Sequence, residues 1–349
     1  MLPHSYEEIR DVIFDEAPLD DTDNVEEFQP LDLFTRLSDA CKSKNKEEIV
    51  QSITSLFILT ARNDLEGIGA DFESLQILNC LMSLVQTDPT SELAGYCLCL
   101  LVNMTSQPFA KETSMVSLDF ANFVAAINEE TSIDKRPLVL ICARNICSFS
   151  EASAKVINAR FPVTQIVDFA LNQKRDDIYQ YTAELMLEYS RNMVGNFDDL
   201  INGFNALILS NNPASFPATL WGFIYILKVF PSLSEVLFSL DFYEFLSYCC
   251  TFDKSKIVLP ALYLLELGFN SESEPPDGFL PLFIVDLLRG KEDKVIGLAA
   301  KTIAVYARNI PQNLLSIFHY GLASAFTEAQ NTAKYETKIK LGLIYSTIV

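Results

Sequence analysis

The chain has 349 residues, of which 49% are hydrophobic, and 46 acidic against 26 basic side chains give a formal net charge of −20. This charge repels nucleic acid phosphates and anionic lipid headgroups, so we expect neither as a partner. No apolar run approaches the roughly 18 to 20 residues of a membrane span, and the acidic first 16 residues lack the pattern of a secretion signal. We therefore expect no membrane insertion and a cytoplasmic location, with the nucleus as a second compartment.

Residues 1–30 differ from the rest of the chain because ten acidic side chains accompany a single basic one, Arg10. This composition predicts an acidic, mostly flexible N-terminal segment. Within it, residues 5–14 are expected to form a short helix, with Ser5 as its N-cap and Glu8 completing a capping box. The even hydrophobic content of residues 31–349 predicts one continuous domain.

From residue 31 onward, apolar segments of helical spacing alternate with polar breaks. In one unit we expect helices at 72–86 and 91–105, the second capped by Ser91, and in the next unit helices at 117–128 and 136–147, with Asp134 as candidate cap. Shorter segments at 107–116, 151–161 and 311–321 lie between units. Each unit therefore has one short and two longer helices, except that a Pro-Pro break at 271–278 predicts a missing first helix.

Asparagine marks the end of these units at a nearly constant spacing. Asn63, Asn103, Asn145, Asn192, Asn270 and Asn309 are separated by 40, 42, 47, 78 and 39 residues, and Pro231 stands at the midpoint of the long gap. The repeat boundaries are approximately 31–63, 64–103, 104–145, 146–192, 193–231, 232–270, 271–309 and 310–349. A period of about 40 residues is typical of helical solenoids, in which each repeat packs mainly against its neighbours.

The segments LLVNMT (100–105), ICARNIC (141–147) and IAVYARNI (303–310) resemble the third-helix signature of armadillo repeats. The resemblance covers residues 31–349, although each repeat is degenerate. It implies an all-α fold, a right-handed α-solenoid superhelix of about eight armadillo-like three-helix repeats. A HEAT-like solenoid with two helices per repeat is the alternative.

In armadillo proteins the third helices line a concave groove, where asparagine side chains bind the backbone of an extended peptide. The resemblance therefore implies a partner-binding ladder, which Arg residues precede in four repeats. Alternatively, the asparagines cap helix ends or join neighbouring repeats, and the arginines pair with acidic side chains of the adjoining repeat. The candidate partner-binding residues are Asn63, Asn103, Asn145, Asn192, Asn270, Asn309, Arg62, Arg144, Arg191 and Arg308.

The expected function is a non-enzymatic scaffold or adaptor that binds an extended or helical segment of another protein. A divergent importin-alpha-like adaptor is one alternative, but that family places Trp one turn before each Asn, whereas these positions hold Leu59, Cys99, Ile141, Glu188, Glu266 and Val305. The only tryptophan, Trp221, is expected in the core. A structural subunit of a larger complex, with its own acidic N-terminus in the groove beside Arg62, Arg144 and Arg191, is another alternative.

The sequence contains few residues and motifs that could support catalysis. The only histidines are His4 and His319, and no glycine-rich phosphate-binding motif occurs. The eight cysteines lie within apolar helical patterns and lack zinc-ligand spacing, so we expect buried free thiols. We predict no enzyme activity, no cofactor and no metal.

Overall fold

The computed structural model describes residues 5–14, 29–62, 68–271, 275 and 279–348, and helices are the only regular elements within these ranges. The chain divides into two compact units, unit 1 at Met1–Ala206 and unit 2 at Leu207–Val349. Each unit is a stack of helical repeats, so the chain is an all-α protein of the α-solenoid class. The predicted fold class is confirmed at this level.

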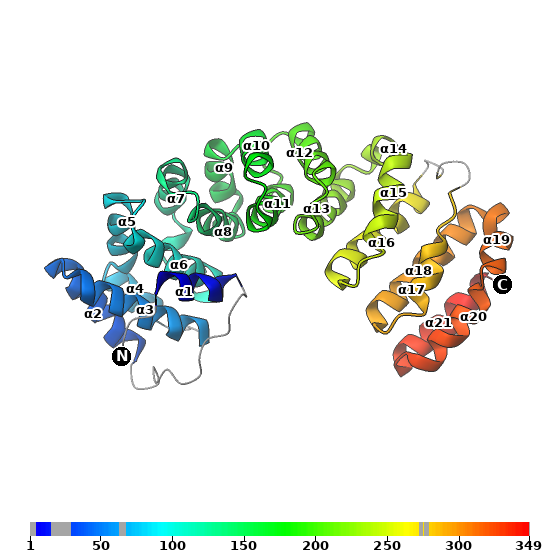
Figure 1. The fold of residues 1–349 in the computed structure, drawn as a ribbon, viewed down its shortest axis with the longest axis horizontal. Helices are drawn as coiled ribbons and strands as arrows, with labels where there is room; N and C mark the ends of the chain where they lie inside the picture. The colour runs from blue at the N-terminus through cyan, green and yellow to red at the C-terminus, as the bar shows by residue number, and fades with distance from the viewer. Residues whose placement is uncertain (1–4, 15–28, 63–67, 272–274, 276–278, 349) are drawn as a thin grey trace. The chain divides into compact units, whose positions relative to one another are not determined.

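Unit 1 contains the N-terminal helix and the first repeats (Figure 1). The last three residues of α12 belong to unit 2. The helices are α1 (Tyr6–Ile13), α2 (Pro30–Ser43), α3 (Lys46–Arg62), α4 (Gly69–Ser74), α5 (Ile77–Thr87), α6 (Glu92–Ser106), the 3-10 helices η1 (Pro108–Glu112) and η2 (Ser114–Val116), α7 (Leu118–Glu130), α8 (Arg136–Cys147), α9 (Glu151–Arg160), α10 (Val163–Gln173), α11 (Asp176–Arg191) and α12 (Phe197–Leu209).

Unit 2 continues the same pattern to the end of the described chain. Its helices are α13 (Phe216–Val229), η3 (Pro231–Leu233), α14 (Ser234–Leu237), α15 (Leu240–Cys249), α16 (Ser255–Asn270), α17 (Leu282–Leu288), α18 (Asp293–Asn309), η4 (Pro311–Asn313), α19 (Leu314–His319), α20 (Leu322–Thr332) and α21 (Tyr335–Ile348).

The final helix of each repeat, called here its last helix, packs against the last helix of the next repeat. In unit 1 the order is α3, α6, α8 and α11, and in unit 2 it is α13, α16, α18 and α21. In seven repeats the helix before the last one packs against it as a second layer: α2, α5, α7, α10, α15, α17 and α20. The stacked last helices carry the residues considered below.

Burial explains why the last helices are the most apolar segments of the sequence. In α6, every residue from Ala94 to Val102 is buried, and in α8 ten of the twelve residues are buried. A helix that is covered on nearly every side must be apolar nearly all round. These two helices therefore show little of the one-sided pattern that marks a surface helix.

Several predicted local features are confirmed and others are wrong. Ser5 and Glu8 form the predicted capping box, and the Ser91 hydroxyl accepts a hydrogen bond from the Ala94 amide. The single helix predicted at 72–86 is instead two helices, α4 and α5, because the chain turns at Gln76, whose φ is 54°. The first helix predicted to be missing in the seventh repeat falls largely in residues 272–278, most of which lie outside the described ranges.

Two further predictions concern single side chains. The N-cap of α8 is Lys135 and has no capping side-chain hydrogen bond, so Asp134 is not the cap; its carboxylate pairs with Lys135 at 3.2 Å instead. Trp221 is half-exposed rather than buried in the core, and its ring contacts Tyr263 at a centroid distance of 5.9 Å.

The tight packing of unit 2 gives a stability prediction at Gly268 in α16. A Cβ atom there would lie 2.7 Å from the Tyr243 hydroxyl oxygen and 2.8 Å from the Phe238 ring, closer than van der Waals contact permits. We expect Gly268→Ala to lower the free energy of unfolding by about 1–3 kcal/mol, because the aromatic side chains must shift. Chemical denaturation followed by circular dichroism measures the change.

Gly297 in α18 is the matched control, because a Cβ there meets no atom within 4 Å. Gly297→Ala should raise stability by about 1 kcal/mol through helix propensity alone. If Gly268→Ala were as stable as Gly297→Ala, the close packing around Gly268 would be contradicted.

Candidate binding surface

The asparagines of the predicted ladder lie at the seams between consecutive last helices. Asn103 of α6 donates from Nδ2 to the Phe57 carbonyl at 3.2 Å and to the Thr60 hydroxyl at 2.6 Å, both in α3. Asn145 of α8 repeats this arrangement one repeat later, donating to the Val102 carbonyl at 3.4 Å and to the Thr105 hydroxyl at 3.0 Å. Each amide thus bonds the last helix of the preceding repeat.

Two other members of the series bond the C-terminal end of the preceding last helix. Asn192 donates to the Cys147 carbonyl at the end of α8, and Asn309 donates to the Phe269 carbonyl near the end of α16. The last four carbonyls of a helix lack intrahelical donors, so these bonds satisfy groups that otherwise need water. This geometry matches the alternative in which the asparagines cap helices and join repeats.

Asn270 and Asn63 differ from the rest of the series. Asn270, the last residue of α16, is exposed and has no side-chain hydrogen bond within the described ranges. Asn63 lies outside the described residues, and of Arg62 only the backbone is described. The binding of a partner by any of these side chains therefore stays a prediction.

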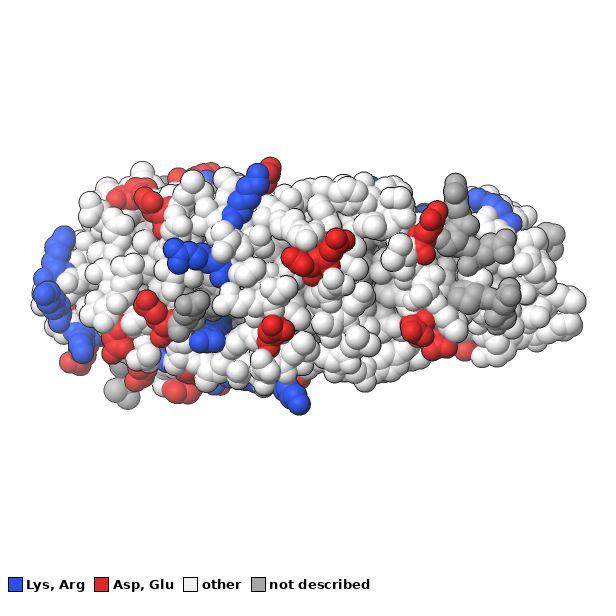
Figure 2. All heavy atoms as spheres, turned by 90° about the horizontal axis from the view of Figure 1, so that it is seen from above, with Lys and Arg blue, Asp and Glu red and all other residues white. Residues whose placement is uncertain are grey.

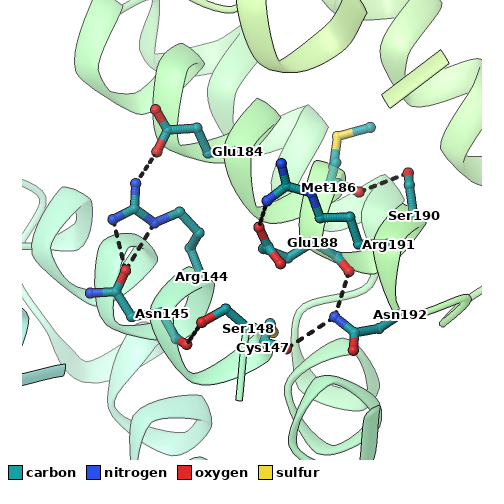
Figure 3. Close-up of polar contacts among 10 residues, drawn as sticks. All are labelled: Arg144, Asn145, Cys147, Ser148, Glu184, Met186, Glu188, Ser190, Arg191 and Asn192. Atoms are coloured by element: carbon teal, nitrogen blue, oxygen red, sulfur yellow. Dashed lines mark hydrogen bonds and ion pairs between the residues drawn. The ribbon is translucent and has the colours of Figure 1, made fainter. Parts of the chain in front are cut away.

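Arg144 extends the Asn145 bond into a network across three last helices, and Figure 3 shows the part between α8 and α11. Its Nε and Nη2 donate to Asn145 Oδ1 at 3.0 and 2.7 Å, while Nη1 forms an ion pair with Glu184 of α11. Gln180 donates to the other oxygen of Glu184 at 3.0 Å. Hydrogen bonds and an ion pair therefore connect α6, α8 and α11 in one continuous chain.

The other two described arginines of the series behave differently. Arg191 pairs with Glu188 one turn earlier in α11, as Figure 3 shows, so this bond stays within one helix. Arg308 is exposed on α18 and has no ion pair within the described part of the chain. Of the ion pairs made by the described candidate arginines, that of Arg144 with Glu184 reaches an adjoining repeat.

Four residues of these seam contacts were not among the candidates predicted from the sequence: Thr60, Thr105, Gln180 and Glu184. A signal was present, because Glu184 lies 40 residues after Arg144 and Thr105 lies 40 residues before Asn145. Side chains one repeat period apart occupy neighbouring positions in adjacent last helices. The repeat period therefore indicates Glu184 as a neighbour of Arg144 and Thr105 as a neighbour of Asn145.

The N-terminal helix α1 lies across the last helices of unit 1, beside α6 (Figure 1). The ring of Tyr6 packs directly on Gly95 of α6, where a Cβ atom would lie only 2.6 Å from the ring. Its centroid is 6.1 Å from that of Tyr96 in an edge-to-face arrangement. Gly95 therefore allows an aromatic ring of α1 to approach the backbone of α6 closely.

The contact continues along α1 toward later repeats. Ile9 is buried, and Phe14, which follows the helix, places its ring 5.9 Å from that of Tyr181 in α11. Glu7 and Glu8 on the opposite side are exposed. The N-terminal helix is thus amphipathic, and its apolar side packs on α6, while Phe14, the residue after it, reaches α11.

Two cations lie near the Tyr6 ring. Lys135 Nζ lies 5.5 Å from the ring centroid and Arg10 Cζ lies 5.9 Å from it, distances at which a cation is attracted to an aromatic face. The Tyr6 hydroxyl is buried and has no hydrogen-bond partner within the described residues. Burial raises the pKa of this phenol. The ring is therefore well accommodated and its hydroxyl is not.

The distribution of charge shows where ionic partners would be attracted. On the face drawn in Figure 2, acidic and basic side chains are scattered among neutral ones, and basic side chains gather only at the end formed by the first helices of unit 1. The last helices differ by unit: α3, α6, α8 and α11 carry seven acidic and five basic residues, whereas α13, α16, α18 and α21 carry three acidic and seven basic residues. Unit 2 thus has a basic row in an acidic chain.

All eight cysteines are free. Six are buried, as predicted, whereas Cys41 and Cys80 are half-exposed. A hydrogen bond from the Cys41 thiol lowers the pKa of Cys80 to about 7 and raises that of Cys41. Within the described ranges, no three His, Cys, Asp or Glu side chains come together in a metal-binding arrangement. None of the described helices combines the length and apolar character needed to cross a bilayer.

Comparison with known proteins gives a likeness of fold. No protein-family model matches the chain, and a search of curated proteins found no significant match. An engineered protein of known structure aligns over 99% of both chains with a TM-score of 0.54 at 14% sequence identity. Two designed armadillo repeat proteins, one in complex with a (KR)4 peptide, align over 92% of this chain and all of theirs, with TM-scores of 0.39 and 0.32 at 11% identity.

The seam bonds give a prediction for Asn145. We expect Asn145→Ala to lower the free energy of unfolding by about 1–3 kcal/mol, because the buried Thr105 hydroxyl and the Arg144 guanidinium lose a partner. Thermal and chemical denaturation followed by circular dichroism measure the loss. Asn270→Ala is the control and should change stability by less than about 0.5 kcal/mol, since Asn270 is exposed. Equal stability of the two variants would contradict a structural role of the seam bond.

Proposed function

We propose that this protein is a non-enzymatic, armadillo-type scaffold that binds a segment of another protein on the last helices of unit 1. The binding surface consists of Gly95 and Tyr96 of α6, Lys135 at the start of α8, and Tyr181 of α11. The segment it takes is a short amphipathic helix with an aromatic residue at the position of Tyr6.

One observation carries this proposal: the surface already holds such a segment, the protein's own α1. Tyr6 rests on Gly95, Ile9 is buried, and Phe14 contacts Tyr181. An amphipathic helix lying in a hydrophobic surface is a recurrent mode of peptide recognition. A surface that accommodates a helix from its own chain has the shape and chemistry to accommodate a similar helix from another chain.

The armadillo assignment is supported by the layout of the repeats. The period of about 40 residues, the row of last helices, and the short helices α9 and α19 before the longer pairs agree with three helices per repeat. The second and sixth repeats also begin with short helices, α4 and α14.

The asparagines support this proposal where a side-chain oxygen has no hydrogen-bond donor within the described residues and could accept from a bound segment. Asn145 Oδ1 already accepts from Arg144, whereas Asn103 Oδ1 has no donor within the described residues. Asn103 lies two turns after Tyr96 on α6, on the side of the helix that α1 contacts. Among the buried or half-buried asparagines of unit 1, it is the one we propose to contact a bound segment.

The test uses a fluorescent peptide with the sequence of residues 5–14, added to the full-length protein and followed by fluorescence anisotropy. In the wild type, α1 competes at an effective concentration of roughly millimolar, so the peptide should bind weakly. Tyr6→Ala removes the ring of α1 and leaves the surface intact. We expect this variant to bind the peptide at least tenfold more tightly than the wild type does.

Two matched variants make the result specific. Gly95→Ala blocks the position of the ring, so it should abolish binding of the peptide, while Ala at a helix interior keeps the fold stable. Tyr6→Phe removes the unpartnered hydroxyl, tightens α1 on the surface and should weaken peptide binding relative to the wild type. A folded Tyr6→Ala variant that fails to bind the peptide would overturn the proposal.

A further inference from the structure

A second surface, in unit 2, has a different composition from the α1 site. Within α18, the residues between 294 and 308 are all buried except one stripe, which we call the basic stripe. Its exposed members are Lys294, Lys301 and Arg308, and its half-exposed members are Gly297 and Ala304. All the long side chains that α18 presents along this stripe are therefore basic.

The stripe is open to a ligand. A Cβ atom added at Gly297 would meet nothing within 4 Å, so no other described element covers the middle of the stripe. Lys294 and Arg308 have no ion pair within the described ranges. Lys301 pairs with Glu266 of α16 at 2.8 Å, but its side chain stays 57% exposed while that of Glu266 is only 14% exposed.

Aromatic side chains lie beside the basic stripe on the two preceding last helices. Tyr263 of α16 is 42% exposed and contacts the half-exposed Trp221 of α13. Tyr225, one turn after Trp221, lies under Lys228, whose Nζ is 5.4 Å from the ring centroid. We call Trp221, Tyr225 and Tyr263 the aromatic cluster.

Two side-chain contacts place the aromatic cluster and the basic stripe on one continuous face. Trp221 of α13 reaches Tyr263 of α16, and Glu266, one turn after Tyr263, reaches Lys301 of α18. The helices α13, α16 and α18 also pack side by side in this order. All of these residues belong to unit 2.

We propose that this face is a second binding site, specific for an extended, acidic protein segment that carries an aromatic or other large apolar residue. The carboxylates of the segment would pair with the basic stripe, and its apolar residue would pack on the aromatic cluster. The inference goes beyond the proposed function, because it concerns another unit, another set of residues and a ligand of different chemistry.

The spacing of the cations specifies the ligand further. Lys294, Lys301 and Arg308 are seven residues apart, which corresponds to about 10.5 Å along a helix. An extended chain advances about 3.3 Å per residue, so residues three apart are separated by about 10 Å. An acidic residue at every third position therefore matches the stripe.

Charge favours a protein segment over a nucleic acid as the occupant. Exposed aromatic rings beside basic residues also suit single-stranded nucleic acids, on which bases stack. However, a polyanion is repelled by the chain's net charge of −20, and only three cations line the stripe, one of them already paired with Glu266. A short segment with three carboxylates fits this limited positive charge better.

The test uses a fluorescent synthetic peptide that has three Asp at three-residue spacing followed by a Phe. Its binding to the full-length protein is measured by fluorescence anisotropy. A peptide with Asn in place of each Asp is the ligand control and should bind at least tenfold more weakly. Affinity for the acidic peptide should also fall as salt rises from about 50 to 200 mM, because exposed ion pairs are screened.

Variants of the protein locate the site. Combined Lys294→Ala and Arg308→Ala, which leave the Lys301–Glu266 pair intact, should weaken binding at least fivefold, and added Lys301→Ala at least tenfold. The matched control removes three exposed lysines of unit 1, by Lys42→Ala, Lys46→Ala and Lys155→Ala, and should change affinity less than twofold. Tyr263→Ala should weaken binding, whereas Tyr335→Ala, at an exposed tyrosine of α21, should not.

Three outcomes would overturn the inference. They are an unchanged affinity in the triple variant of α18, an equal loss in the unit 1 control, and tighter binding of an oligo(dT) strand than of the acidic peptide. The unit 1 variants Tyr6→Ala and Gly95→Ala should leave binding of the acidic peptide unchanged. The two proposals can therefore fail separately.

Discussion

The packing of last helices against one another is the constraint on which the rest of the structure depends, and α6, α8, α16 and α18 each lie between two others. A helix enclosed in this way loses access to water along most of its length, so its own polar atoms and those of its neighbours must be paired across the seams. Asn103 and Asn145 do this with the same pair of acceptors, a carbonyl and a threonine hydroxyl of the preceding helix. Asn192 and Asn309 instead bond carbonyls at the ends of the preceding last helices, so four of the regular asparagines join neighbouring repeats.

The same constraint leaves each last helix one narrow stripe on which side chains can vary without harm to the stack. In α6 that stripe includes Gly95 and Tyr96 and is covered by α1, so the helix is buried on nearly every side. In α18 it holds Lys294, Lys301 and Arg308 and is open. The seams therefore contribute to stability, and the stripes are the surfaces that we propose to bind partners, so one repeat architecture carries two surfaces of different chemistry.

The repeat period and the type of each element could be predicted from the sequence, because apolar spacing and caps are local signals. The 117–128 and 136–147 predictions correspond to α7 and α8. The break at Gln76 could not be predicted, since a left-handed conformation of a non-glycine residue inside an apolar run leaves no mark in the pattern. Whether an asparagine at a helix end faces a ligand or the neighbouring helix depends on interhelical packing, which is why the site residues were assigned to both roles. The sequence predicted an N-terminus in the groove as one alternative, but the contact of Tyr6 with Gly95 of α6 could not be predicted, for the same reason.

The contacts of Tyr6 indicate how tightly α1 binds the unit 1 surface. The site accepts an aromatic ring against Gly95 and places two cations near it, yet it gives the phenol hydroxyl no partner. An unpartnered buried hydroxyl costs about 1–3 kcal/mol, whereas a phenylalanine in its place would avoid that cost and retain the ring contacts. The N-terminal helix is therefore not the best ligand that the surface could bind. An external amphipathic helix with phenylalanine at this position would avoid the cost of the buried hydroxyl. This gain would offset part of the advantage that tethering gives to α1. Under the proposed function, an external helix that fits the surface better would therefore displace α1.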